Sequence, residues 1–361
     1  NGYFRFDRSE KETGFGDIVP GMSLNDLHSD IYISTGNEIS RSVRPNEMIS
    51  MPLFLSSMTD KNYGEKLNLK IKLYGVDAIG QEKTWRNYVQ IIDYKPWIQT
   101  ALEPVMIQMP DEKAVVIVSL ILEDSNGKII NRNFTSFVVE ADSPTEINLQ
   151  NGSKAKLVSF DPKNFSEAKW SKKQWNVMEG AKINGAGAGY FEYNIKLPAN
   201  FQFSADTKME FWSELSAKQL FAKDMDKKLK GNEEYMLGAI AEPSQNPNSY
   251  PMTDTSRFPS EVKFSFNGIS AENVILPNDP ADSRGILSWH YQIQDKKLRE
   301  PGSYGYLTKV KIPQQALDLA RNSGEIKIRM EVSNQSAGGL AIYGEKFGRY
   351  PMNPSLIITG N

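Results

Sequence analysis

Few residues in this sequence could carry nucleophilic or metal chemistry. Its 361 residues include no cysteine and only two histidines, His28 and His290. Disulfides and thiolate metal sites are therefore excluded, and a histidine-rich zinc site cannot form. A Ser-His-Asp triad could combine His290 with Ser288 and Asp282.

Ser288 and His290 are two positions apart, so on a strand they would share one face. The strand-to-helix turn that exposes a nucleophilic serine does not surround Ser288. We therefore favour a structural or ligand-binding role for His290 over a triad.

Acidic residues are abundant, with 44 aspartates and glutamates in the chain. A retaining glycosidase needs two carboxyl groups roughly 5 Å apart on a rigid support, and such abundance always offers some pair. Glu192 and Glu210 lie beside aromatic residues in predicted strands. A partnered carboxylate at the core edge or on a solvated face is the simpler interpretation, so we predict no catalytic residue in this chain.

The loop at 277–285 is rich in turn-forming residues and contains Asp279 and Asp282. Hard oxygen ligands on a tight loop suit calcium, so these two aspartates are candidate ligands of a structural calcium ion. The alternative is a turn lock in which Asp282 binds Arg284 or a backbone N–H. Apart from this calcium ion, the sequence predicts no cofactor.

Aromatic residues follow this loop in a pattern suited to carbohydrate. Binding sites for small ligands combine an apolar floor with a few polar groups, and sugars use an aromatic face in this way. Trp289, Tyr291 and Arg284 are the first candidates for sugar contacts, and Trp170 and Trp175 are the next. Burial of the same side chains between sheets is the alternative interpretation.

Length and composition bound the remaining possibilities. A chain of 361 residues predicts two or three domains. The net charge of −2, from 42 basic and 44 acidic residues, leaves no basic surplus for nucleic acid or an anionic membrane. No apolar run approaches the roughly 20 residues that cross a bilayer. The chain begins with Asn1, so we expect a processed mature protein or a piece of a longer one.

The elements that must position these residues are predicted to be strands. Residues 67–73 alternate apolar and polar side chains without a break, which is typical of a strand with one solvated face. Asn126 and Gly127 mark a hairpin turn, and residues 129–139 form the returning strand. About seven such strands without a helix predict an immunoglobulin-like β-sandwich over residues 1–143, including an N-terminal segment.

Residues 144–361 also have mainly the pattern of strands and long loops. The glycines at 184–189 run into an alternating strand and not into a helix, which disfavours a phosphate-binding loop. Residues 215–230 could be a helix or a strand, and residues 313–320 predict a short helix that ends before Gly324. The pattern indicates a larger jelly-roll β-sandwich, so the predicted fold class is all-β throughout.

Several short motifs carry a family resemblance. In the second part of the chain they are KING (182–185), GYFEY (189–193), LPNDPADSRG (276–285), GSYGY (302–306), GGLAIYG (338–344) and GRYP (348–351). In the first part they are DIYIS (30–34), RP (44–45) and LYG (73–75). Together they resemble the C-terminal accessory region of Bacteroides-type glycoside hydrolase family 2 proteins, an immunoglobulin-like domain followed by a galactose-binding-like jelly roll.

The resemblance implies a parent enzyme similar to a β-galactosidase or β-glucuronidase, acting on polysaccharide in the periplasm or at the cell surface of a Gram-negative bacterium. In that family a (β/α)8 barrel carries the catalytic glutamates, and no stretch here offers about 250 residues of alternating strand and helix. This chain would then be a non-catalytic carbohydrate-binding accessory region. Its partners would be an oligosaccharide or polysaccharide and the catalytic barrel of the same parent chain, with no nucleic acid and no membrane span.

The alternative is a free-standing surface glycan-binding or adhesion protein without an attached enzyme. A lipoprotein signal upstream of Asn1 favours this alternative, whereas a (β/α)8 pattern there favours the accessory region. An independent lyase or hydrolase is a third class, which a polysaccharide panel would test.

Overall fold

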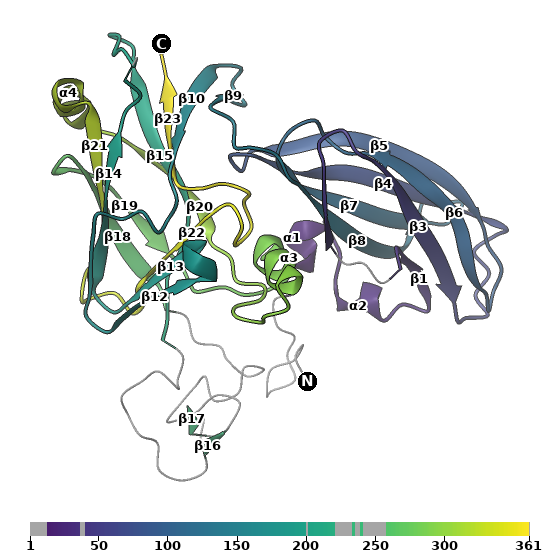
Figure 1. Ribbon diagram of the computed structural model, residues 1–361. Helices are drawn as coiled ribbons and strands as arrows, with labels where there is room; N and C mark the ends of the chain where they lie inside the picture. The colour runs from purple at the N-terminus through teal and green to yellow at the C-terminus, as the bar shows by residue number, and fades with distance from the viewer. Residues whose placement is uncertain are drawn as a thin grey trace.

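The computed structural model describes residues 13–36, 40–199, 201–220, 233–234, 239–240 and 258–360. Within these residues the chain is almost entirely β-structure, and its sheets gather into two groups (Figure 1). The predicted all-β fold class is therefore confirmed. We name the groups the first sheet pair, within residues 31–139, and the second sheet pair, within residues 146–359.

The first sheet pair consists of a three-stranded and a five-stranded sheet. The strands of the smaller sheet are, in spatial order, β1 (Ile31–Ser34), β3 (Met48–Ser57) and β6 (Gln99–Gln108). The strands of the larger sheet are β2 (Ser40–Val43), β8 (Ile129–Val139), β7 (Ala114–Glu123), β4 (Lys66–Asp77) and β5 (Glu82–Asp93). All the pairings are antiparallel except that of β2 with β8.

The strand predicted at 67–73 lies inside β4, and its alternation produces the core of this pair. Leu67, Leu69 and Ile71 point inward and are at most 1% exposed, whereas Asn68 is half-buried and Lys70 faces solvent. Burying one apolar face is what stabilises such a strand. The hairpin predicted at Asn126 and Gly127 is also confirmed, because β7 pairs antiparallel with β8 across it and Gly127 has φ 80°.

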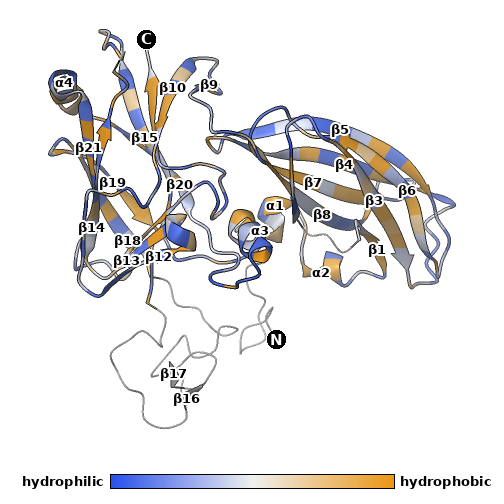
Figure 2. Ribbon diagram, viewed as in Figure 1, coloured by the Kyte–Doolittle hydropathy of each residue, from blue (hydrophilic) through white to orange (hydrophobic). Residues whose placement is uncertain are grey.

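The second sheet pair encloses the larger core. Bands of hydrophobic and hydrophilic residues alternate along the strands of both pairs (Figure 2). Its eight-stranded sheet contains, in spatial order, β12 (Lys173–Val177), β13 (Lys182–Ala186), β22 (Leu340–Tyr343), β15 (Lys208–Ser216), β23 (Ser355–Thr359), β10 (Lys154–Ser159) and β9 (Glu146–Asn148), with β20 (Tyr306–Lys311) also paired to β15. The facing five-stranded sheet contains β11 (Glu167–Trp170), β14 (Gly189–Lys196), β21 (Glu325–Val332), β18 (Ser260–Phe266) and β19 (Ile269–Leu276). Two further short strands, β16 (Glu233–Glu234) and β17 (Ala239–Ile240), pair with each other.

Helices are short and occupy the margins of the sheets. They are α1 (Phe15–Ile18), α2 (Leu24–Leu27), α3 (Ile286–Gln294), α4 (Gln314–Ser323) and the 3-10 turn η1 (Met178–Gly180). The predicted helix at 313–320 is confirmed by α4, which ends at Gly324 with φ 72°. Of the undecided segment at 215–230, residues 215–216 belong to β15, while residues 221–230 lie outside the described part of the chain. No helix in the described residues is long and apolar enough to pass through a membrane.

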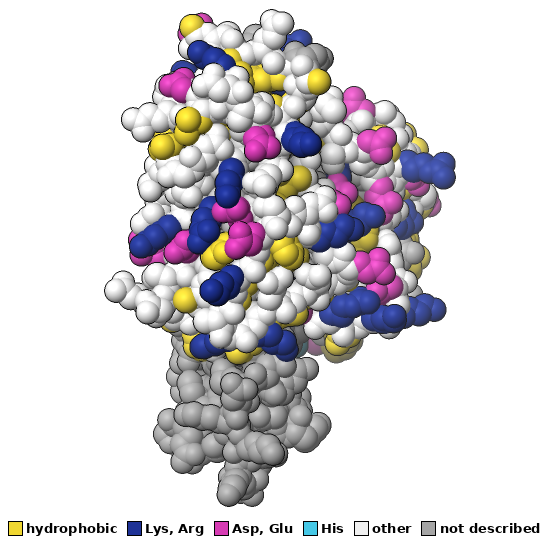
Figure 3. Space-filling view, turned by 60° about the vertical axis from the view of Figure 1, so that its left-hand side comes forward, with side chains coloured by type: hydrophobic (Ala, Val, Ile, Leu, Met, Phe, Trp, Pro, Cys, Tyr) yellow, Lys and Arg dark blue, Asp and Glu magenta, His cyan; other side chains and the backbone are white. Residues whose placement is uncertain are grey.

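A mixed apolar layer joins the two sheet pairs, and α1 and α3 lie in it (Figure 1). Val19 comes from the N-terminal segment, and Ile286 and Leu287 come from α3. Ile117 and Val138 lie on the outer face of the five-stranded sheet of the first pair. All five are less than 10% exposed. The sheet pairs are therefore packed on each other through buried apolar side chains. On the molecular face in Figure 3, basic and acidic side chains are interspersed, as the small net charge suggests.

Candidate functional site

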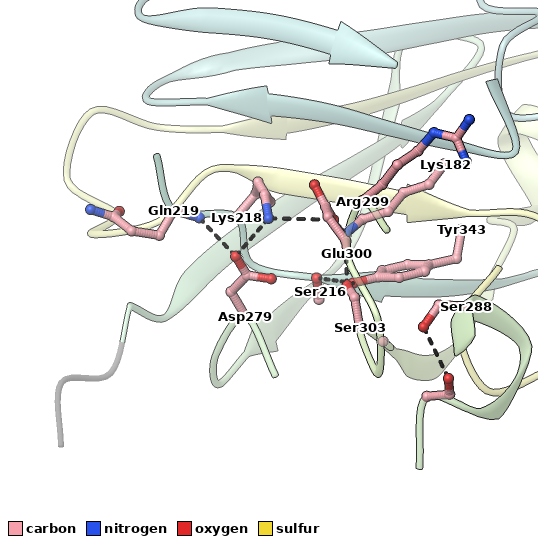
Figure 4. Close-up of polar contacts among 12 residues, drawn as sticks. Lys182, Ser216, Lys218, Gln219, Asp279, Ser288, Arg299, Glu300, Ser303 and Tyr343 are labelled. Carbon is pink, nitrogen blue, oxygen red and sulfur yellow. Dashed lines mark hydrogen bonds and ion pairs between the residues drawn. The ribbon is translucent and has the colours of Figure 1, made fainter. Parts of the chain in front are cut away.

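Residues 277–305 cover part of the outer face of the eight-stranded sheet. The inner face of this sheet supplies core residues such as Ile183 and Phe211, so alternate residues on the same strands point outward. The outward residues include Lys182 and Asn184 on β13 and Glu214 on β15, all fully buried. The covering segment contacts Lys182 through Glu300 and Ser303 (Figure 4) and contacts Glu214 through the backbone N–H of Gly305.

Two lysines and two carboxylates form a compact cluster under this segment. The Lys182 ammonium binds the Glu300 carboxylate and donates to Ser303 Oγ at 2.8 Å. The Lys218 ammonium lies 2.9 Å from Asp279 Oδ2 and 3.7 Å from Glu300 Oε2. We call Lys182, Lys218, Asp279 and Glu300 the lysine–carboxylate cluster. Its formal charges balance, which is what burial of four ionic groups requires.

The electrostatics of this cluster favour the ionised form of Glu300. Burial acts to raise the pKa of Glu300, but the ammonium groups of Lys182 and Lys218 outweigh it and lower that pKa below its ordinary value. The cluster is closed on another side by Tyr343, whose ring centroid lies 4.6 Å from Lys182 Nζ and whose hydroxyl hydrogen-bonds Ser303 Oγ at 3.1 Å. These contacts make the cluster a lock that holds residues 277–305 on the sheet.

Trp175 borders the same cluster. Its ring centroid is 5.8 Å from Lys218 Nζ and 5.4 Å from Lys173 Nζ, and its side chain is half-buried. Lys218 thus contacts both Asp279, a predicted calcium ligand, and Trp175, a predicted sugar contact. Cations already lie near the ring, which leaves less of its surface for a sugar.

The two candidate calcium ligands bind different cationic side chains. Asp279 binds Lys218, whereas Asp282 binds Arg284 through Nε at 3.1 Å and Nη2 at 2.5 Å and also accepts the Arg284 backbone N–H at 2.8 Å. The second arrangement is the turn lock that the sequence offered as the alternative. Among the residues that the structure describes, no group of three or more acidic or histidine side chains could hold a metal ion.

Arg284 also reaches beyond its own loop. Its guanidinium binds the Asp17 carboxylate of α1 and lies 4.7 Å from the ring centroid of Tyr304. Arg284, a predicted sugar contact, therefore mainly links the N-terminal segment to residues 277–305 by binding a carboxylate on each. We call this arrangement the Arg284 fork. Arg284 nevertheless lines a cleft of about 730 Å³ between the sheet pairs, whose floor is Tyr74. We call it the Tyr74 cleft.

Trp289 lies elsewhere, on the exposed side of α3. Its side chain is 40% exposed and borders a shallow hollow of about 260 Å³. Ile293, Leu298 and Pro301 form the apolar wall of this hollow, and lysines lie at its margin. We call Trp289 and these three residues the Trp289 ledge.

Tyr291 faces a third hollow, of about 1170 Å³, between the sheet pairs. Its hydroxyl donates to Glu140 Oε1 at 3.4 Å, and burial together with Glu140 raises the pKa of Tyr291. The preceding His290 lies 2.7 Å from Ser42 Oγ through Nε2, and burial lowers its pKa. This face of α3 therefore forms part of the contact between the sheet pairs.

The expectation that Ser288 and His290 share one face of a strand is wrong, because both lie on α3. Residues two apart on a helix are separated by about 200° around its axis, whereas on a strand they coincide. Ser288 Oγ donates to the carbonyl of Gly285 at 2.9 Å, a local helix contact. The same geometry separates Trp289 from Tyr291, so the first three sugar candidates line three different hollows and do not form one site.

Trp170 packs against the core between the sheets, which is the alternative to a sugar contact that the sequence allowed for it. Its indole lies against Gly185 and Gly189, where an added Cβ would fall within 2.0 Å and 2.7 Å of the ring. Its centroid is 5.1 Å from that of Phe191 in the core. Gly185 and Gly189 therefore make room for an indole, and Gly187 has φ 81°, which explains these glycines without a phosphate.

The acids considered for catalysis have structural partners. Glu192 binds Lys327 at 2.7 Å, and Glu210 accepts the indole N–H of Trp212 at 2.8 Å. Glu214 accepts three backbone N–H groups, and burial raises its pKa to about 7. Sequence reasoning missed the roles of Lys182, Lys218 and Glu300. Lys182 and Lys218 offer only the local signal of a charged residue in or next to a strand, and Glu300 lies in a loop without such a signal.

Comparison with known proteins gives distant likenesses only. The chain matches no family model and no curated protein. Solved structures that it matches weakly include wild-type BuGH86 in complex with neoagarooctaose (9% identity, TM-score 0.23, 91% of this chain and 34% of that chain). Others are a Bacteroides uniformis β-glucuronidase (9%, 0.18, 92% and 30%) and a partial N-terminal region of an enterococcal surface protein (9%, 0.21, 90% and 92%). This chain thus spans about a third of the length of the first two, and at these scores none of them assigns it to a family or an activity.

Proposed function

We propose that this chain is a non-catalytic, carbohydrate-binding accessory region of a glycoside hydrolase, divided into an immunoglobulin-like domain at 1–143 and a jelly roll at 144–361. The observation that carries the proposal is the Trp289 ledge, an exposed indole beside an apolar wall on an all-β support. A pyranose presents one apolar face to such an indole and its hydroxyl groups to nearby polar side chains.

The ledge is rigid enough to bind a ligand without reordering. The side chain of Gln292 is buried and donates to the Ser288 carbonyl at 2.7 Å. Its amide oxygen accepts the backbone N–H groups of Arg299 at 2.6 Å and Glu300 at 2.7 Å. The end of α3 and the turn that carries Pro301 are therefore fixed to each other, which lowers the entropic cost of binding. Lys296 and Lys297, which also line the hollow, supply donors for sugar hydroxyl groups.

Glu214, Glu192 and Glu300, whose side chains are largely buried in the second sheet pair, support a binding role more than a catalytic one. A glycosidase acid and its partner must reach substrate, whereas Glu214 is fully buried and bound by the backbone. Glu192 is occupied by Lys327 and Glu300 by Lys182. We accordingly expect no turnover of oligosaccharides by this chain.

Isothermal titration with a panel of galactose- and uronate-containing oligosaccharides tests the proposal. Trp289→Ala should weaken binding at least about tenfold, because an indole face contributes more than about 1.4 kcal/mol. Trp97→Ala is the matched control, since Trp97 is 65% exposed on the first sheet pair, far along the chain from the ledge. Equal affinity of Trp289→Ala and wild type would remove the ledge from the site. Hydrolysis of any panel member by the wild-type chain would contradict the non-catalytic role.

The proposed parent enzyme is tested by the reading frame upstream of Asn1. A (β/α)8 pattern there would support a secreted hydrolase with this chain as its accessory region, in the periplasm or at the cell surface. A lipoprotein signal directly before Asn1, without a barrel, would instead identify a free-standing glycan-binding protein.

A further inference from the structure

The Tyr74 cleft is a second place where the described surface is hollowed, and residues of both sheet pairs and of the N-terminal segment line it. Its floor is the outer face of β4 and β7, where Tyr74 pairs with Ile117 and Lys72 with Ser119. Its walls are the turn after α1 on one side and Arg284 and Arg349 on the other. A volume of about 730 Å³ lies within the range of sites for small ligands.

The rim of this cleft is biased toward positive charge. Four of its lining side chains are basic and two are acidic. Two of the basic groups already have carboxylate partners, since Lys83 binds Glu112 at 2.7 Å and Arg284 binds Asp282. Lys72 and Arg349 form no ion pair with any described residue. They are the two lining cations without a carboxylate at ion-pair distance, and they outnumber Glu82, the one acidic lining residue that forms no ion pair with a described residue.

Arg349 is held in place by its backbone. Its N–H donates to Glu214 Oε1 at 2.9 Å, next to Gly348 with φ 96°. Its guanidinium lies 5.5 Å from the ring centroid of Tyr350 and keeps its donors available. A buried carboxylate thus fixes the backbone from which the half-buried Arg349 side chain extends.

The floor of the cleft is largely apolar and includes the ring of Tyr74. The hydroxyl of Tyr74 donates to the carbonyl of Ile18, which fixes the ring, and Lys72 Nζ lies 5.1 Å from the ring centroid. Ile117 and Ile121 extend this apolar floor along β7. A ligand that uses both features needs a ring with an apolar face and at least one negative charge at its edge.

We propose that the Tyr74 cleft binds a carboxylate-bearing oligosaccharide, with Ile117 and Ile121 under the apolar face of a sugar ring and Arg349 and Lys72 on its carboxylate groups. This inference rests on the proposed carbohydrate-binding function but concerns a site separate from the Trp289 ledge. An arginine suits a planar carboxylate because its guanidinium can donate two parallel hydrogen bonds.

Titration of the full chain with trigalacturonate, and with its methyl ester as the uncharged counterpart, tests the inference. The acid should bind at least about tenfold more tightly than the ester, a difference of about 1.4 kcal/mol. Arg349→Gln and Lys72→Gln should each remove most of this difference. Raising the ionic strength from about 50 to about 500 mM should weaken binding of the acid and leave that of the ester nearly unchanged.

The controls separate this site from the ledge. Lys263→Gln removes an exposed charge from β18, on the five-stranded sheet of the second pair, and should leave the affinity unchanged. Trp289→Ala should retain trigalacturonate binding while losing that of neutral oligosaccharides. Equal affinity for acid and ester, or binding that survives Arg349→Gln and is lost in Trp289→Ala, would overturn the inference and leave the ledge proposal standing. Absence of trigalacturonate binding to the folded wild-type chain would overturn it as well.

Discussion

The carboxylate of Glu214 accepts the backbone N–H of Gly305 at 2.7 Å, deep under the segment that covers the eight-stranded sheet. The same carboxylate accepts the N–H of Arg349 at 2.9 Å and of Tyr350 at 3.0 Å. One side chain on β15 thereby fixes two loops that are separate in sequence. Because one of them carries Arg349 to the Tyr74 cleft, the stability of the fold and the shape of that cleft depend on one buried acid.

The first prediction concerns the pH dependence of this contact. Burial raises the pKa of Glu214 from its ordinary value to about 7, so the folded state retains a proton that the unfolded chain loses near pH 4.5. The free energy of unfolding should therefore fall as pH rises from about 4.5 to about 7, by about 3 kcal/mol from this group. Urea unfolding at a series of pH values measures this slope.

Glu214→Gln should flatten the slope, because the amide does not titrate yet its oxygen can still accept from the backbone. Glu210→Gln is the control, since Glu210 lies two residues earlier on β15 and is bound by the indole of Trp212. It should keep the wild-type slope. An identical pH profile in Glu214→Gln and wild type would show that another group is responsible.

The second prediction concerns the Arg284 fork between the N-terminal segment and residues 277–305. Arg284→Gln leaves the Asp282 carboxylate, which is 12% exposed, without its cation and should lower the free energy of unfolding by about 1–3 kcal/mol. Arg284→Lys keeps the charge but loses the fork, so its cost should be intermediate.

Arg299→Gln provides the comparison, because Arg299 pairs with Asp295 in an exposed i,i+4 arrangement and should cost only about 0.5 kcal/mol or less. Chemical unfolding of the three variants ranks them. A cost for Arg284→Gln no larger than that for Arg299→Gln would mean that the fork does not stabilise the contact.

The third prediction concerns the lysine–carboxylate cluster. Lys182→Met leaves the buried Glu300 with Lys218 at 3.7 Å and should destabilise the fold by about 3–5 kcal/mol. The double variant Lys182→Met, Glu300→Gln should recover part of this loss, because no uncompensated carboxylate then remains in the interior.

A double-mutant cycle measured by urea unfolding gives the coupling energy of the pair. Lys327→Met is the matched control, since Lys327 binds Glu192 at 2.7 Å but is 49% exposed, and it should cost about 1 kcal/mol or less. Purely additive costs in the cycle would refute the coupling of Lys182 to Glu300.

The strands were predictable because their signals are local. In β4 the alternation of apolar and polar residues fixes which side chains are buried, whatever the partner strand is. The turn at Asn126 and Gly127 and the helix end at Gly324 depend on the backbone freedom of one or two residues. All-β architecture and several strand ends could therefore be stated from the sequence.

The helix α3 was not predictable in the same way. Trp289, His290 and Tyr291 favour a strand by type, yet Ile286 and Leu287 become buried against Ile117 and Val138 of the first sheet pair. Tertiary packing overrides local propensity here. This single change of element separates Trp289 from Tyr291 and removes the triad geometry.

The sequence by itself determined the chemistry that this chain lacks, namely thiolate and histidine-rich sites, and the periodicity of its sheets. Only the tertiary structure decided which charges meet. Lys182 and Glu300 are 118 residues apart, and Glu214 and Gly305 are 91 apart, so no local pattern pairs them. Strand register places Lys182 and Glu214 on the outer face of one sheet, where Glu300 and Gly305 of the covering segment meet them. Burial there makes a partner obligatory, because an isolated charge in the interior costs more than folding can supply.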